Sequence, residues 1–152
     1  MSPEEITFIP PRKPEPLLQE LYWPDKWKVL VCCVMLNCTR RGQVDNVVET
    51  FFIRYPNAES YIKAYEWPLS KSDIIDLIKP LGFYNRRSLG LYKFSCDYIS
   101  KQWSDPRELH GIGEYAARCY EILFLGKFGK TPPVDHALSD YWHWYMETHD
   151  KH

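Results

Sequence analysis

The stretch from Leu109 to Tyr120 reads LHGIGEYAARCY and predicts a tight hairpin followed by a helix. Gly111 and Gly113 are separated by one apolar residue, a spacing that allows positive φ angles and close approach of the backbone to another molecule. The peptide N–H groups at the start of the next helix can then face an anion such as a phosphate. A GxG pair is also typical of a plain tight turn between helices, so this stretch alone leaves both interpretations open.

Helical signals flank this turn on both sides. Upstream, DPREL supplies Asp105 as an N-cap and Pro106 as the first helical residue, so we expect a brief helix that runs into Gly111. Downstream, apolar residues recur at helical spacing from Ala116 and predict a helix that ends near Gly126. The turn therefore joins two helices.

The rest of the chain repeats the helical pattern. Apolar spacing predicts helices over Trp27 to Met35 with Pro24 in the first turn, Val44 to Phe52, Ile74 to Ile78 ending near KPLGF, and Leu89 to Trp103 after YNRR. A last, aromatic-rich helix follows TPPVD. Alternating strand patterns are nearly absent and no long repeat is present, so we predict an all-α protein.

Composition limits the classes of protein that the chain can belong to. Its 152 residues are 45% apolar, enough for one compact core and too few to expect two. No run suits a membrane span or a signal peptide, so we expect a soluble, intracellular protein. Five cysteines without CxxC spacing argue against a disulfide framework or a metal cluster. The net charge of −1 means that binding to nucleic acid must depend on local features.

The N-terminus differs from the remainder. Residues 1–16 hold five of the twelve prolines and cannot sustain a helix. We therefore expect a proline-rich arm over 1–16 and a single helical domain over 17–152.

Several of these motifs together resemble a known family. LHGIGEYAA, followed by the Gly/Pro-rich TPPV and Asp135, resembles the hairpin, loop and aspartate of the helix-hairpin-helix DNA glycosylases. ELYWPDKWKVLVCCVMLNCT, KPLGFYNRR and VDHALSDYWHWYMETHDK resemble, in order, the thymine/uracil mismatch glycosylase branch, whose domain is fused to a methyl-CpG-binding domain in vertebrates. The resemblance extends from Pro10 to Lys151. It implies the helix-hairpin-helix glycosylase fold and excision of thymine or uracil mispaired with guanine in double-stranded DNA, the first step of base excision repair.

The resemblance makes Asp135 the catalytic residue. Cleaving a base from deoxyribose passes through an oxocarbenium-like sugar, which needs one anion near C1′ and a route for water. Asp135 shares a helix face with Leu138, Trp142, Tyr145 and Met146, the inward face, and the helix start stabilises its charge. The alternative is that Asp135 serves only as an N-cap.

Tyr115 decides the type of reaction. Bifunctional relatives carry a Schiff-base lysine at this position, so the resemblance implies simple hydrolysis without lyase activity and without a cofactor. Tyr115 either contacts the extruded pyrimidine or packs in the core. The resemblance also places Gln19, Leu36 and Asn37 in the base pocket.

The expected contacts to DNA come from three loops. In the first, Cys38 stands where relatives carry an arginine that fills the space left by the base, and Thr39 and Arg40, or Arg41 in its place, follow it. In the second, Phe83 is the expected wedge between the strands, although burial beneath the loop is an equal alternative. The third is the hairpin, with His110, Gly111, Ile112 and Gly113. Basic pairs such as Arg86 and Arg87 are further candidates for phosphate contacts.

Two rival interpretations remain. His136, Asp140, His143 and Glu147 share one face of the last helix at a spacing that suits metal ligands, although a solvated polar face explains them better. The chain could also be a DNA-binding module of this fold that has lost turnover. We favour the enzyme and no metal site, and we expect a monomer that acts in the nucleus if the source is eukaryotic.

Overall fold

The computed structural model describes residues 6–149, in which ten helical segments follow one another without a strand. They are η1 Leu18–Leu21, α1 Lys26–Leu36, α2 Arg41–Arg54, α3 Ala58–Tyr65, α4 Pro68–Ile78, η2 Lys79–Leu81, α5 Tyr84–Ser100, η3 Pro106–Glu108, α6 Glu114–Leu125 and α7 His136–His149. The all-α prediction is confirmed. None of these helices has both the length and the apolar character to cross a membrane.

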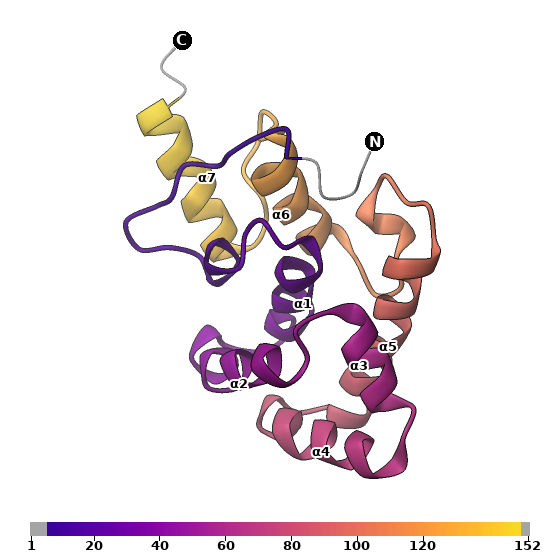
Figure 1. Ribbon diagram of the computed structural model, residues 1–152. Helices are drawn as coiled ribbons and strands as arrows, with labels where there is room; N and C mark the ends of the chain where they lie inside the picture. The colour runs from indigo at the N-terminus through magenta and orange to yellow at the C-terminus, as the bar shows by residue number, and fades with distance from the viewer. Residues whose placement is uncertain (1–5, 150–152) are drawn as a thin grey trace.

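Helix α1 is the central element of the fold. Seven of its 11 residues are buried, on all sides of the helix, which is the pattern of a helix enclosed by others. It contacts α2, α5 and α6, and Figure 1 shows it between a group formed by α2 to α5 and a group formed by α6 and α7. The two groups therefore share one core around α1.

The helix boundaries differ in places from those expected. Helix α1 begins after Asp25, whose side chain accepts from the Lys28 N–H, so Pro24 lies before the cap. Helix α5 begins at Tyr84 and includes YNRR, and it ends at Ser100 before Trp103. Local periodicity could not place these ends because caps and turns decide them.

The short helix α3 had no counterpart in the prediction. Its buried face is formed by Ala58 and Tyr61, and the Tyr61 hydroxyl donates to the Ser88 carbonyl at 2.8 Å. A buried tyrosine needs a hydrogen-bond partner for its hydroxyl, and the sequence does not reveal which group supplies it.

The described part of the arm, residues 6–16, lies across α6 and α7 (Figure 1). The Phe8 ring packs beside Gly126 and Phe128, and the Tyr141 hydroxyl donates to the Pro11 carbonyl. Glu20 is 3% exposed, and its carboxylate accepts from the N–H groups of Lys13 and Leu17. Burial raises its pKa, although these hydrogen bonds oppose the rise.

We expect Gly126→Ala to lower the free energy of unfolding by about 1–2 kcal/mol, because an L side chain is strained in the left-handed region. Gly126 has φ of 65°, and an added Cβ would lie 2.9 Å from the Phe8 ring. Gly90→Ala is the matched control: Gly90 lies inside α5 with nothing within 4 Å of the added carbon, so alanine should stabilise. Urea denaturation measures both variants. Equal stability of Gly126→Ala and the wild type would contradict this account.

Candidate active site

Buried residues anchor the hairpin in the core, and its tip is exposed to solvent. Asp105 caps η3 as expected, and Leu109 and Ile112 are 2% and 7% exposed. Gly111 adopts φ of 78°, whereas Gly113 has an extended conformation with φ of −96° and is the N-cap of α6. No side chain caps α6, so the N–H groups of its first turn keep their capacity to bind an anion.

Two hairpin residues have specific supports. His110 is exposed, and its N–H donates to the Asp97 carboxylate of α5 at 2.8 Å. Ile112 packs into the core and its N–H donates to the Leu109 carbonyl at 3.2 Å, so its side chain is not part of the exposed hairpin tip. Ile112 anchors the hairpin, and Gly111, Gly113 and His110 form its accessible part.

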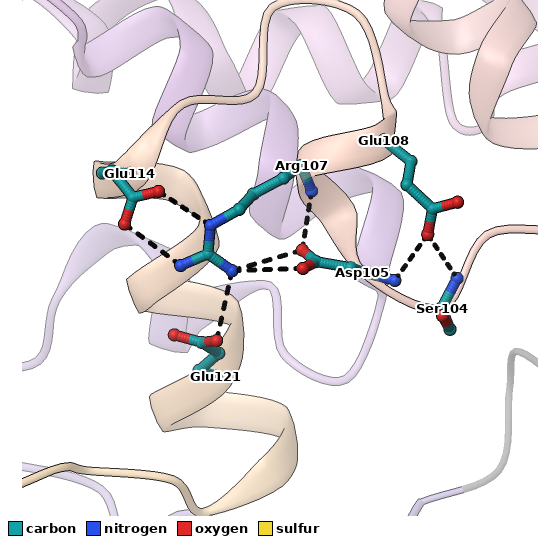
Figure 2. A network of polar contacts seen from close by, with 6 residues as sticks. All are labelled: Ser104, Asp105, Arg107, Glu108, Glu114 and Glu121. Carbon is teal, nitrogen blue, oxygen red and sulfur yellow. Dashed lines mark hydrogen bonds and ion pairs between the residues drawn. The ribbon is translucent and has the colours of Figure 1, made fainter.

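A polar network centred on Arg107 lies next to the hairpin (Figure 2). The Arg107 guanidinium binds both oxygens of Glu114 at 2.8 and 3.1 Å and also contacts Asp105 and Glu121. The hydrogen bonds from Arg107 lower the pKa of the Glu114 carboxyl. A lone carboxylate beside the hairpin would oppose phosphate binding, but the guanidinium partly compensates the charge of Glu114.

Asp135 is both a cap and a cavity residue. Its Oδ2 accepts from the Leu138 N–H at 3.0 Å and its carbonyl accepts from the Ser139 N–H at 2.8 Å, so it caps α7. The side chain is half-buried and lines a cavity of about 530 Å³. Asp135 therefore caps α7 and lines the cavity at the same time, so the two roles do not exclude each other.

The loop that delivers Asp135 is fastened from two helices. The Arg118 guanidinium, from α6, donates to the carbonyls of Phe128 and Thr131 at 3.2 and 2.9 Å. The Trp142 indole, from α7, donates to the Phe128 carbonyl at 2.8 Å. Sequence reasoning missed Arg118, since its acceptors are ten and thirteen residues away and no local pattern marks them.

Three of the four predicted base-pocket residues line the same cavity as Asp135, namely Leu36, Asn37 and Tyr115. The fourth, Gln19, is 2% exposed and lies behind Tyr115. Its amide donates to the Tyr115 hydroxyl at 2.6 Å and to the Cys33 sulfur at 3.5 Å. Burial strongly raises the pKa of the Tyr115 phenol, which therefore stays protonated and can still donate a hydrogen bond. Tyr115 thus faces both the cavity and the core.

Cys38 and Phe83 stand out by their backbone conformation. They are the only non-glycine residues with positive φ in the described part of the chain, at 60° and 47°. Cys38 is exposed, and Phe83 is 65% exposed, so the alternative that Phe83 is buried is wrong. Strained residues of this kind gather at functional sites.

A second cavity, of about 510 Å³, adjoins the first. Phe83, Arg86 and His110 line it, and Asn37 and Cys38 line both cavities. The loop after α1 therefore forms the ridge between the two cavities. Val134, which sequence reasoning also missed, is fully exposed beside the first cavity.

The cations after Cys38 have different surroundings. Arg41 donates to the Pro16 carbonyl and pairs with Asp45, whereas the exposed Arg40 contacts no acceptor within residues 6–149. Thr39 Oγ1 is held within the loop, since it donates to the Asn37 carbonyl at 3.3 Å. Of the two arginines that the sequence offered to replace the missing one, Arg40 is the available residue.

The last helix offers no metal centre within the described residues. His136 contacts Asp140 at 3.7 Å, but no three or more side chains of the metal-binding types gather there or elsewhere in 6–149. The metal-site alternative is therefore not supported.

Comparison with known proteins identifies relatives, although no protein-family model matches. The methyl-CpG-binding domain protein 4-like protein of Arabidopsis thaliana is 38% identical over 136 residues, which are 90% of this chain and 29% of that protein. The thymine/uracil-DNA glycosylase of Pyrobaculum aerophilum is 31% identical over 117 residues, 72% of this chain and 47% of the relative. The chain thus spans less than half the length of these curated relatives.

A solved structure shares the fold. The structure of a thermostable thymine-DNA glycosylase superposes with a TM-score of 0.60 at 26% identity, over 72% of this chain and 51% of that one. The helical arrangement described above is therefore that of a DNA glycosylase.

We expect Arg107→Gln to weaken binding to duplex DNA by about three- to tenfold at low salt, because Glu114 then carries an uncompensated charge beside the hairpin. Without the guanidinium the pKa of the Glu114 carboxyl rises toward its ordinary value. The loss of affinity for DNA should become smaller as the pH falls through that pKa, because protonation removes the charge of the Glu114 carboxylate. Fluorescence anisotropy with a labelled duplex measures both effects.

The double variant Arg107→Gln with Glu114→Gln is the control for this prediction. It removes the repelling carboxylate together with its partner and should recover binding. A double variant as weak as Arg107→Gln alone would refute the charge argument.

Proposed function

The chain belongs to the helix-hairpin-helix DNA glycosylases, and on that premise we propose that it hydrolyses the N-glycosidic bond of thymine or uracil mispaired with guanine. The observation that carries the proposal is the cavity shared by Asp135, Tyr115, Asn37 and Leu36. It combines the Asp135 carboxylate with polar groups suited to a pyrimidine edge, and the Glu114 carboxylate, which also lines it, is paired with Arg107. The names of the relatives support thymine and uracil as the bases.

In the proposed reaction the extruded nucleotide enters this cavity with its C1′ near Asp135. As the bond to the base breaks, positive charge develops on the sugar, and the carboxylate stabilises it. The base leaves with the electron pair of the broken bond, and the carboxylate orients the water that adds to C1′. The proton released by that water passes to the departing base, so the free pyrimidine and an abasic site remain. Tyr115 has no amine with which to form an imine, so the strand stays intact.

The remaining residues bind and open the duplex in this proposal. The hairpin residues Gly111 and Gly113 hold a phosphate at the start of α6, while Phe83 enters the stack and the Cys38 loop fills the space left by the base. Arg40 supports this loop by contacting a phosphate. The chemistry requires no cofactor, and we propose that a single copy acts on DNA in the nucleus if the source is eukaryotic.

Asp135→Asn should reduce excision from G·U and G·T duplexes by about 100-fold or more, because the amide cannot stabilise the charged sugar. Asparagine caps helices as well as aspartate does, so the variant should keep its melting temperature. Product is revealed as strand breaks after alkali.

The same assay separates the enzyme from an inactive DNA-binding module. If wild-type protein binds the mismatch duplexes but yields no product from either, the module is the better description. Product from Asp135→Asn at the wild-type rate would contradict the role of Asp135, and strand breaks without alkali would contradict that of Tyr115.

Cys38→Arg should tighten binding to a duplex with an abasic site opposite guanine by about tenfold, because a guanidinium can fill the gap and form a charge-assisted hydrogen bond to a phosphate. Cys38→Met is the control for length without charge and should change binding little. Anisotropy titration at fixed salt measures the affinities. Equal affinity of the arginine and methionine variants would refute a role for charge at this position.

A further inference from the structure

Arg87, in the first turns of α5, joins the end of α1 to the loop before α5. A guanidinium has five N–H donors, and here each nitrogen is engaged, with five acceptors in all. Nε donates to the Gly82 carbonyl, Nη1 to the Val34 and Met35 carbonyls, and Nη2 to the Asn37 carbonyl and Thr39 Oγ1, at 2.5 to 3.2 Å. Three chain segments therefore meet at one side chain.

This arrangement leaves Arg87 no donor for DNA. The sequence pairs Arg87 with Arg86 as a candidate phosphate contact, but the guanidinium of Arg87 is saturated and half-buried. Burial lowers its pKa, and no carboxylate within residues 6–149 pairs with it. Its charge is instead compensated by carbonyl oxygens, two of them from the last turn of α1, where the helix dipole favours a cation. Arg87 is therefore built to hold backbone in place.

The segments that Arg87 holds contain both residues with a strained backbone. Asn37 and Thr39 flank Cys38, whose φ is 60°, and Gly82 precedes Phe83, whose φ is 47°. In addition, the backbone N–H of Arg87 donates to the Phe83 carbonyl at 2.8 Å. Left-handed conformations of cysteine and phenylalanine persist only where surrounding contacts impose them. Arg87 supplies such contacts to the loop that contains Cys38 and to the loop that contains Phe83.

We propose that Arg87 is a positioning residue that makes the Cys38 loop and Phe83 a single rigid wedge with two tips at fixed spacing. This inference rests on the proposed function and adds to it a division of labour. Asp135 and Tyr115 act on the extruded base, whereas the wedge formed by the Cys38 loop and Phe83 opens the duplex. The wedge matters only while neighbouring bases hold the pyrimidine in the stack, because an unstacked base needs no extrusion.

The test compares Arg87→Lys with the wild type on two substrates under single-turnover conditions. Lysine keeps the charge but has only three donors on one nitrogen and cannot reproduce the five contacts. One substrate is a G·U duplex, and the other is the same duplex with mispaired bases on both sides of the uracil. We expect the rate to fall about 10- to 100-fold on the first and less than about threefold on the second. An equal loss on both substrates, or no loss on the first, would overturn the proposal.

Arg54→Lys is the matched control, since Arg54 is exposed at the end of α2 and lines neither cavity. It should behave as the wild type on both substrates. Thr39→Val is a milder variant that removes one acceptor of Arg87. It should shift the ratio of the two rates in the same direction but less, which keeps the test informative if Arg87→Lys folds poorly.

A second measurement does not depend on activity. In the free protein, hydrogen exchange at the amides of 36–40 and 82–84 should accelerate together in Arg87→Lys and remain unchanged in Arg54→Lys. Acceleration in only one segment, or in neither, would overturn the coupling. If the wild type excises no base, the proposed function fails, while the exchange result still decides whether Arg87 couples the two loops.

Discussion

The burial of α1 is the constraint on which the rest of the structure depends. From Val29 onward α1 is apolar on every side and has no face to leave in water, so other elements must enclose it. Helices α2, α5 and α6 do so. The last turn of α1 leads into the loop with Asn37 and Cys38, which separates the two cavities.

Enclosing a helix creates a second requirement, because its last carbonyl groups lose their water. Backbone polar groups in such a place need partners, and the guanidinium of Arg87 provides them for Val34 and Met35. The same side chain reaches the loops on either side. Arg87 thus satisfies backbone carbonyl groups at the end of α1 and also shapes the surface proposed to enter DNA.

The electrostatics of the site are local. The net charge of −1 offers no general attraction to DNA, and the hairpin has several carboxylates beside it. Arg107 compensates part of this charge, and the uncapped start of α6 supplies backbone N–H groups. Cations at Arg40, Arg86 and Arg118 lie around the cavities or the loop that separates them. Affinity for DNA in this fold must therefore arise from placed groups and not from overall charge.

The sequence by itself determined the features that depend on neighbours along the chain. Helical spacing predicted the all-α architecture, and glycine spacing and a capping aspartate marked the hairpin and the start of the last helix. Only the tertiary structure decided that Arg86 is exposed while the adjacent Arg87 is half-buried. It also decided that Phe83 faces solvent and that Gln19 lies behind Tyr115. The acceptors of Arg87 at the end of α1 and in the loop after it are 48 to 53 residues away from it, and Tyr115 is 96 residues from Gln19. Such contacts form because the core brings distant segments together, and no local pattern records that distance.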